Sequence, residues 1–417
     1  MRWAFWRKPE AKADFTELTY AALLGEPQTG SGVSVTTDSA LRVSTVLACV
    51  RVLAEGVAQM PLRLYRSGSA DSKEPATEHP VYWLLYRRPN DWMTSFEFRE
   101  VLTLHAALTG NGFAFINRLS DGSIRELIPL MPGNVTVEQA KDYTLSYKVR
   151  GGDGAEIATI PWQNIMHLRG PSWDGFRGMN AVQLAREAIG LSVATEQAQG
   201  KLFSNGARPG GILSTEQTLD EKQIARIREA FATAYSGGNQ FKTAVLDGGF
   251  KYAQTTMTGI DAQQLESRKF QIEEICRFFR VYPAMIGYSD KASTYASVEQ
   301  FFLAHVVHSL GPWIERWEQA LSRDLLTDNE LKAGLFPKFS VQGLLRGDAK
   351  SRVEYYRGMI NIAAMNPNEV RSLEELNPYE GGETFRAALN TVDATLPPPD
   401  VEEPAPAPKD IADDAAV

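Results

Sequence analysis

The side chains best suited to chemistry include a pair of histidines in the C-terminal half of the chain. His305 and His308 lie three positions apart in a predicted helix, a spacing at which two imidazoles can share one metal ion. No third histidine, cysteine or carboxylate stands at ligand spacing, and His305 falls on the apolar stripe of the helix. We therefore predict that His305 is a hydrogen-bonded core residue and that no metal is bound, and His105 has the same interpretation.

The two cysteines offer the other reactive group, a thiol. Cys49 and Cys276 each lie within an apolar helical pattern, where burial suppresses the thiolate form that a nucleophile needs. Two cysteines supply neither a disulfide framework nor a four-cysteine zinc site. A cysteine and a histidine from distant positions can still meet in a fold, so a hydrolase with such a pair stays an alternative from the enzyme class.

Glycine-rich motifs add no catalytic signal. The phosphate-binding pattern G-x-x-x-x-G-K-[ST] and the nucleophile pattern G-x-S-x-G are both absent from the sequence. Gly110-Asn111-Gly112 begins like a dinucleotide motif, but it precedes a strand-like segment and lacks the third glycine, so we interpret it as a turn. The sequence therefore predicts no catalytic residue and no cofactor.

Composition limits the possible partners. The chain has 417 residues, of which 43% are hydrophobic, and a formal net charge of -8. An acidic chain of this length folds into a large core but is not suited to gripping nucleic acid through many phosphates. The N-terminus lacks the apolar stretch of a secretory signal, and no run approaches the roughly 20 apolar residues of a membrane span. We expect no membrane contact.

The first part of the chain mixes helix and strand patterns. Apolar residues recur at helical spacing between 41 and 60, and Thr94 with Glu97 forms a capping box for another helix. The stretch 113–170 is mostly strand-like, with GGDG as a hairpin turn. These patterns predict an α+β domain over 38–177.

Long helices dominate the part that follows. Asn180 is a predicted N-cap, and a small αβ insert with a capping box at Thr218 and Glu221 separates two long helices. A third helix is predicted to begin at a Ser297–Gln300 capping box and to kink at Gly311-Pro312, because proline removes a backbone donor. Trp313 and Trp317 on this helix are expected in the core or in a subunit interface.

The end of the chain carries one strong helix start and then a change in composition. Asn366 as cap, Pro367 at the first helical position and Glu369 at the third predict a helix. From residue 391 the chain is proline-rich, acidic and free of aromatic residues, which is typical of a disordered tail.

Several stretches resemble the portal proteins of tailed bacteriophages, in the branch found in many long-tailed phages. The resemblance covers nearly everything between residues 38 and 390. It is carried by VSTVLACVRVLAEGVAQMPLRLYR (43–66), HPVYWLLYRRPN and TSFEFREVLTLHAALTGNGFAFINR (within 79–118), GMNAVQLAREAIGLSVATEQAQGKLFSNGARPGGIL (178–213), DAQQLESRKFQIEEICRFFRVYPAMIG (261–287) and NEVRSLEELNPYEGGE (368–383).

The resemblance implies a portal-type α+β fold whose copies form a ring, usually dodecameric, at one vertex of a capsid. Double-stranded DNA would be packaged and ejected through the ring, with the terminase large subunit, the major capsid or scaffold protein and a head-completion adaptor protein as partners. The protein would be assembled in the host cytoplasm and located in the virion. The implied parts are a flexible arm (1–37), a wing (38–177), a stem helix (178–206), a clip (207–257), a second stem helix (258–282), a tunnel loop (283–297), a long kinked helix with a wing strand (298–347), helices of the crown (348–390) and a disordered tail (391–417).

Two sets of site residues follow from this resemblance. The tunnel loop would face moving DNA, and Lys291 repeated around a ring would give weak, exchangeable phosphate contacts. The clip would dock the terminase through an exposed helix and turn. The tunnel-loop residues are Tyr288, Ser289, Asp290, Lys291, Ser293, Thr294, Tyr295 and Ser297, and the clip residues are Lys222, Arg226, Glu229, Asn239 and Lys242.

Physical arguments agree with the resemblance. A closed ring needs apolar or aromatic surface beyond the core of one subunit, which the tryptophans and partial helical stripes could supply. The energy for translocation must come from a separate ATPase, since the phosphate-binding motif is missing. The alternatives are a Cys/His hydrolase such as a capsid-maturation protease, and a monomeric DNA-binding or scaffolding protein.

Overall fold

The computed structural model divides the chain into two compact units, 1–345 and 346–417. Within the described residues, no helix has both the length and the apolar character needed to cross a membrane. The described residues are 29–68, 72–152, 154–204, 212–215, 218–235, 251–253, 260–288, 295–341, 349–374 and 376–385.

The core of the first unit forms around three helices, α3 (Ser44–Ala58), α5 (Ser95–Thr109) and α11 (Gly311–Leu325). Trp317 of α11 is fully buried, and its indole N–H donates to Thr103 Oγ1 of α5 over 2.9 Å. An indole whose one polar atom is satisfied gives a large apolar contribution to packing without an unpaired donor. Trp317 is therefore a core residue, and it is not free for an interface between subunits.

Three antiparallel sheets complete the α+β part. The central strand β3 (Asn111–Arg118) pairs with β4 (Ile124–Leu130) on one side and β8 (Ile165–Arg169) on the other. The predicted turn Gly110-Asn111-Gly112 is confirmed only at Gly110, which caps α5 with a φ of 81°, and is wrong for Asn111 and Gly112, which already belong to β3. The second sheet is β5 (Val135–Gln139), β6 (Leu145–Arg150) and β7 (Glu156–Pro161), and the third is β11 (Leu335–Phe339), β1 (Leu62–Ser67) and β2 (Lys73–Pro75).

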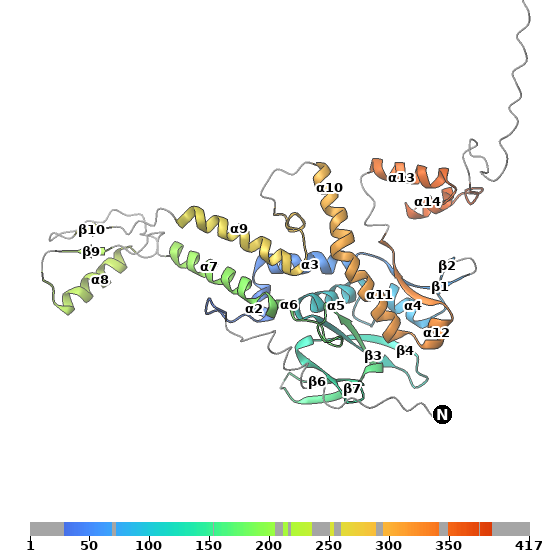
Figure 1. Cartoon of the computed structure of the whole chain (residues 1–417), viewed down its shortest axis with the longest axis horizontal. Coiled ribbons are helices and arrows are strands. Elements are labelled where there is room, and N and C mark those ends of the chain that lie inside the picture. The colour runs from blue at the N-terminus through green and yellow to red at the C-terminus, as the bar shows by residue number, and fades with distance from the viewer. Residues whose placement is uncertain are drawn as a thin grey trace, which may run out of the picture. The chain divides into compact units, whose positions relative to one another are not determined.

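Two long helices, α7 (Arg186–Ser204) and α9 (Ile260–Phe279), run side by side (Figure 1). A short helix, α6 (Ala181–Leu184), precedes α7, and the predicted N-cap is confirmed because Asn180 Oδ1 accepts from the Gln183 amide over 3.0 Å. Residues 29–37 were assigned from the sequence to the arm, and one of them contacts α7: the Gly30 amide donates to Glu187 Oε2 over 3.0 Å.

A third helical element consists of α10 (Tyr295–Ala304), a π-helix η6 (His305–Leu310) and α11 in direct succession. The sequence predicts a kink at Gly311-Pro312, and the π-helix lies directly before these two residues. A π-turn widens the helix immediately before the proline, where the proline ring and its missing N–H disturb regular α-helical bonding. The predicted start at a Ser297–Gln300 capping box is wrong, because α10 already begins at Tyr295.

The second unit contains α13 (Ala349–Asn361) and α14 (Pro367–Leu373). The predicted start of α14 is confirmed as a capping box between Asn366 and Glu369. The two helices are joined by the Tyr356 hydroxyl, which donates to Glu374 Oε1 over 2.7 Å. The other elements are α2 (Thr37–Leu41), α4 (Pro80–Tyr86), η2 (Pro132–Asn134), η3 (Trp162–Asn164), β9 (Ile212–Ser214), α8 (Glu221–Tyr235), β10 (Lys251–Ala253), η5 (Pro283–Ile286) and α12 (Asp328–Lys332).

Candidate functional site

The predicted tunnel loop lies between η5 and α10, and only its two ends are described. Tyr288 directly follows Gly287, which ends η5 with a φ of 78°. Tyr295 and Ser297 lie in the first turn of α10. The remaining predicted residues, Ser289, Asp290, Lys291, Ser293 and Thr294, lie outside the described residues.

The two ends of the loop are held by the same anchor. Helix α9 ends at Arg280, which has a φ of 55° and whose amide donates back to the Arg277 carbonyl over 3.1 Å. The Arg280 carbonyl accepts from Ser309 Oγ of the π-helix over 2.6 Å. This bond ties the end of α9 to the π-helix that follows α10, so the elements that lead into and out of the loop are joined to each other.

Two thiols meet one helix turn before this anchor. Cys49 of α3 and Cys276 of α9 are both fully buried, and their sulfur atoms are 3.7 Å apart. Contact with the Cys276 thiol and burial raise the pKa of Cys49, which keeps the Cys49 thiol protonated. The sequence analysis placed each cysteine on a packed helix but did not predict that the two would touch.

A polar clamp fixes α11 against β8. The His167 amide donates to Asp324 Oδ2 over 2.9 Å, and the Arg323 guanidinium donates to the His167 carbonyl over 2.8 Å and to Asp324 Oδ2 over 2.7 Å. The His167 imidazole lies between the Tyr147 hydroxyl at 3.1 Å and Asn111 Oδ1 at 3.0 Å. Since Asn111 Oδ1 can only accept, Nε2 carries the proton and Nδ1 accepts from Tyr147.

The environment keeps this histidine neutral. Burial, with smaller effects from Arg169 and Arg323, holds the pKa of His167 well below its ordinary value of 6.5. Burial and the nearby Asp324 carboxylate raise the pKa of Tyr147 to about 12, so its hydroxyl also stays protonated. The clamp is thus a structural network of neutral donors and one ion pair.

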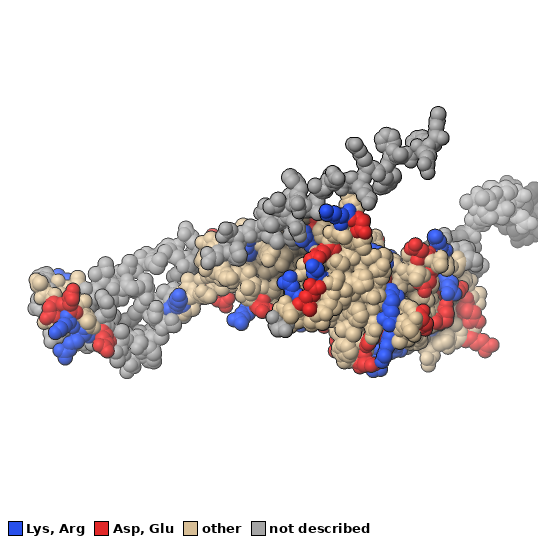
Figure 2. Space-filling model, turned by 90° about the horizontal axis from the view of Figure 1, so that it is seen from below, with Lys and Arg blue, Asp and Glu red and all other residues tan. Residues whose placement is uncertain are grey.

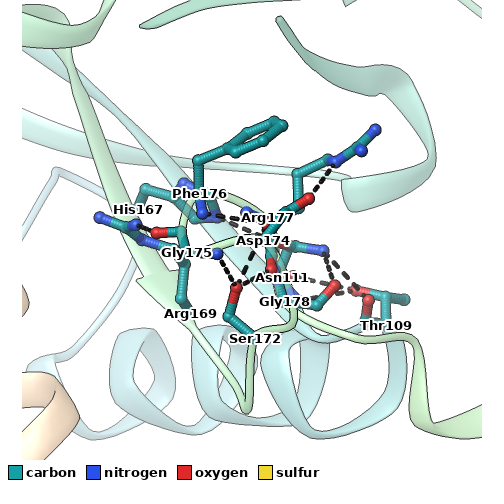
Figure 3. Close-up of polar contacts among 10 residues, drawn as sticks. All are labelled: Thr109, Asn111, His167, Arg169, Ser172, Asp174, Gly175, Phe176, Arg177 and Gly178. Atoms are coloured by element: carbon teal, nitrogen blue, oxygen red, sulfur yellow. Dashed lines mark hydrogen bonds and ion pairs between the residues drawn. The ribbon is translucent and has the colours of Figure 1, made fainter. Parts of the chain in front are cut away.

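The turn that leads from β8 to α6 is fixed by side chains that point toward one another (Figure 3). Asp174 Oδ1 accepts from the Phe176 and Arg177 amides over 3.0 and 2.8 Å, and Asp174 Oδ2 accepts from Arg177 Nε over 2.9 Å. Asn111 Oδ1 accepts from the Gly178 amide over 2.8 Å, and any side chain at Gly178 would collide with the Gly110 carbonyl. These contacts set where the first long helix begins.

The predicted clip residues that the structure describes all lie on α8. Lys222, Arg226 and Glu229 are exposed, and the end of the molecule that α8 occupies in Figure 2 carries charges of both signs. Asn239 and Lys242 lie outside the described residues.

The predicted start of α8 is wrong in one detail. The capping pair is Asp220 and Gln223, with the Gln223 amide donating to Asp220 Oδ1 over 2.7 Å, and not Thr218 with Glu221. Aspartate directly before the first helical residue is the stronger N-cap, so the helix begins at Glu221.

The two histidines whose spacing would allow a shared metal ion both belong to the π-helix. His305 is buried, and burial lowers its pKa, whereas His308 is exposed. We predicted a hydrogen-bonded imidazole for His305, and this prediction is wrong for Nδ1, which has no partner within the described part of the chain. The same holds for Nδ1 of the partly buried His105, whose pKa is also lowered by burial. No group of three or more possible metal ligands occurs among the described residues.

Comparison with known proteins identifies the family. The phage portal protein family model matches residues 44–375. The portal protein of Enterobacteria phage HK97 is 32% identical over 354 residues, which cover 84% of this chain and 82% of that protein. The probable portal protein of Streptomyces phage phiC31 is 33% identical over 376 residues, covering 86% and 80%.

A solved structure gives the same fold. A chain from the neck of a native gene transfer agent particle, computed with C12 symmetry, aligns with a TM-score of 0.54 at 23% identity. The alignment covers 82% of this chain and 94% of that one. Because the family model matches most of its length and the HK97 portal protein is 32% identical over 84% of it, this chain belongs to the phage portal protein family.

Proposed function

We propose that identical copies of this head–tail connector subunit close into a ring at one vertex of a capsid, and that double-stranded DNA passes through its central channel. A dodecamer is the favoured number of copies, since a chain of the same fold belongs to a neck with C12 symmetry. The family match favours this function over the Cys/His hydrolase and over the monomeric DNA-binding or scaffolding protein.

The observation that carries the proposal is the surface of α10. Three consecutive apolar residues, Phe301, Phe302 and Leu303, are exposed by 39%, 41% and 52%, and Val307 of the following π-helix is exposed by 53%. Consecutive residues of a helix point about 100° apart, so these side chains cover much of its circumference. An exposed cluster of large apolar side chains normally marks a surface that a partner covers, and here a neighbouring copy would bury it.

A closed ring joins two different faces of each copy, because every interface is head-to-tail around the axis. The sequence analysis looked to the tryptophans for this surface, but Trp313 and Trp317 are buried within one subunit. The apolar face of α10 takes their place in the proposal, with Phe278 of α9, 45% exposed, as a further apolar contact.

The parts of the ring follow the family assignments, which we propose for this chain. The wing is 38–177, the stem helices are 178–206 and 258–282, the clip is 207–257 and the tunnel loop is 283–297. The loop would approach the DNA, with Lys291 as a weak phosphate contact. The anchor between Arg280 and Ser309 supports this proposal, because a loop that meets moving DNA needs a fixed base.

The protein partners are proposed at the two ends of the ring. The terminase large subunit and later the head-completion adaptor would dock on the clip, where α8 presents Lys222, Arg226 and Glu229. The mixed charge of this helix favours a partner with a complementary mixed surface over nucleic acid. The capsid or scaffold protein would contact the outer surface of the wing.

The test of the ring is the variant Leu303→Asp in the full-length protein. Because Leu303 is half exposed in the subunit, aspartate should leave the fold intact but place a charge in an apolar interface. We expect wild-type rings by negative-stain electron microscopy and sedimentation, and folded single subunits for the variant. The matched control is Ile157→Asp on β7, where the side chain is 71% exposed and no ring contact is proposed. Rings formed equally well by Leu303→Asp would refute the role of α10.

A further inference from the structure

The two cysteines form a buried pair that the proposed ring does not use. Cys49 lies in the middle of α3 and Cys276 near the end of α9, separated by 227 residues in sequence. Their sulfur atoms are 3.7 Å apart, and the residues are exposed by only 0% and 1%. Sulfurs in van der Waals contact need to approach by about 1.7 Å to reach the bond length of a disulfide, about 2.05 Å.

The packing around the pair favours reaction with each other over reaction with other molecules. Both side chains belong to the main core cluster, together with Leu53 and Val57 of α3 and Phe279 of α9. A thiol enclosed by apolar side chains can react with a dissolved reagent only when the surrounding core opens locally, and the nearest sulfur that either cysteine can reach is the other one. A small oxidant that enters during local opening would therefore produce an intrachain product.

We propose that Cys49 and Cys276 are an oxidation site, at which a disulfide forms within one subunit and ties α3 to α9. The oxidant is a low-molecular-weight disulfide, such as oxidised glutathione. One cysteine thiolate attacks it and releases one glutathione thiol, and the second cysteine then attacks the mixed disulfide and releases the other. Two protein thiols lose two protons and two electrons in total, and one small disulfide is reduced to two thiols.

The state of the cysteine pair should differ between the inside and the outside of the cell. In a reducing cytoplasm the pair stays as thiols, so α3 and α9 are held only by packing. Once a particle is outside the cell, oxidation would link the helix that ends at the base of the loop covalently to the central helix of the core. The cross-link closes a very long loop of chain, which is the case in which a disulfide restricts the unfolded state most.

The test uses the purified full-length protein, reduced and then incubated with oxidised glutathione. We expect free thiols, counted after denaturation, to fall from two to none, and the intact mass to fall by two hydrogen atoms. A non-reducing peptide digest should contain one cross-linked pair of peptides that carry Cys49 and Cys276. The melting temperature of the oxidised protein should be higher by roughly 5 °C, as estimated for a long closed loop.

Two variants make the result decisive. In Cys49→Ser and in Cys276→Ser the serine nearly matches the volume of cysteine. No intrachain cross-link can form in either variant, so oxidised glutathione should not raise the melting temperature. Two free thiols after prolonged oxidation, glutathione adducts on both cysteines, or a cross-link between subunits would each overturn the proposal. Ring formation is scored separately by electron microscopy, so the failure of the disulfide and the failure of the ring give different results.

Discussion

Replacing Asp324 with alanine should release α11 from β8 and destabilise the first unit. The Asp324 side chain is 4% exposed, and its two oxygens accept from the His167 amide at 2.9 Å and from Arg323 Nε and Nη2, both at 2.7 Å. Alanine leaves the buried His167 N–H without an acceptor and removes the charge partner of Arg323.

The magnitude follows from the exposure of each partner. A buried backbone N–H that loses a charged acceptor costs about 1.5–3 kcal/mol. The Arg323 side chain is 41% exposed and can turn to water, so its ion pair adds about 0–1 kcal/mol. We expect Asp324→Ala to lower the free energy of unfolding by about 2–4 kcal/mol. Asp324→Asn keeps an oxygen for the His167 amide and should cost about 1 kcal/mol.

The assay is urea unfolding followed by tryptophan fluorescence, to which all eight tryptophans contribute, among them Trp313 and Trp317 of α11. All variants are measured at one protein concentration, because assembly would otherwise shift the apparent stability. We expect the free energy of unfolding to increase from the alanine variant to the asparagine variant to the wild type. If alanine and asparagine cost the same, or if alanine costs less than about 0.5 kcal/mol, the clamp does not hold α11 and the reasoning fails.

Two further outcomes follow from the same region. Arg280→Gly should stabilise the protein by about 0.5–1 kcal/mol, because glycine adopts the positive φ of 55° without a Cβ clash. Arg280→Ala should give no such gain. Thermal unfolding of both variants checks this, and equal melting temperatures would contradict it. The folded pKa of His167 lies below the unfolded value of 6.5, so the unfolded state binds more protons between these values; stability is complete above pH 6.5 and falls with decreasing pH. Below about pH 6 this one residue should change the free energy of unfolding by about 1.4 kcal/mol per pH unit. His167→Gln should remove this slope in urea unfolding measured across pH. An unchanged slope in the variant would show that the imidazole is protonated in the folded state.

Local signals in the sequence predicted the helix boundaries well. The capping box at Thr94 and Glu97 and the one at Asn366 and Glu369 are both present, because each depends only on residues three apart. The pattern failed at Ser297, which lies inside α10, since serine three residues before glutamine also occurs within helices. A capping pattern predicts a helix nearby more reliably than it predicts the first residue.

Contacts between distant parts of the chain could not be predicted in this way. Nothing local to Cys49 or Cys276 indicates that the two thiols touch, because their distance depends on how α3 packs against α9. The same is true of His167, which has no special neighbours in sequence but receives Asp324 from a helix that begins more than a hundred residues later. The exposed face of α10 was also missed, since an apolar pattern alone does not distinguish a core surface from an unpaired one.

The π-helix His305–Leu310 changes the direction in which the side chains of α10 point relative to those of α11. Each residue of an α-helix advances the side chains by about 100°, and a π-turn accommodates about one residue more than an α-turn. The stripe of α11 that contains Trp317 therefore does not continue in phase into α10. One uninterrupted rod of backbone thus serves two surfaces, turning its apolar side inward along α11 and outward at Leu303.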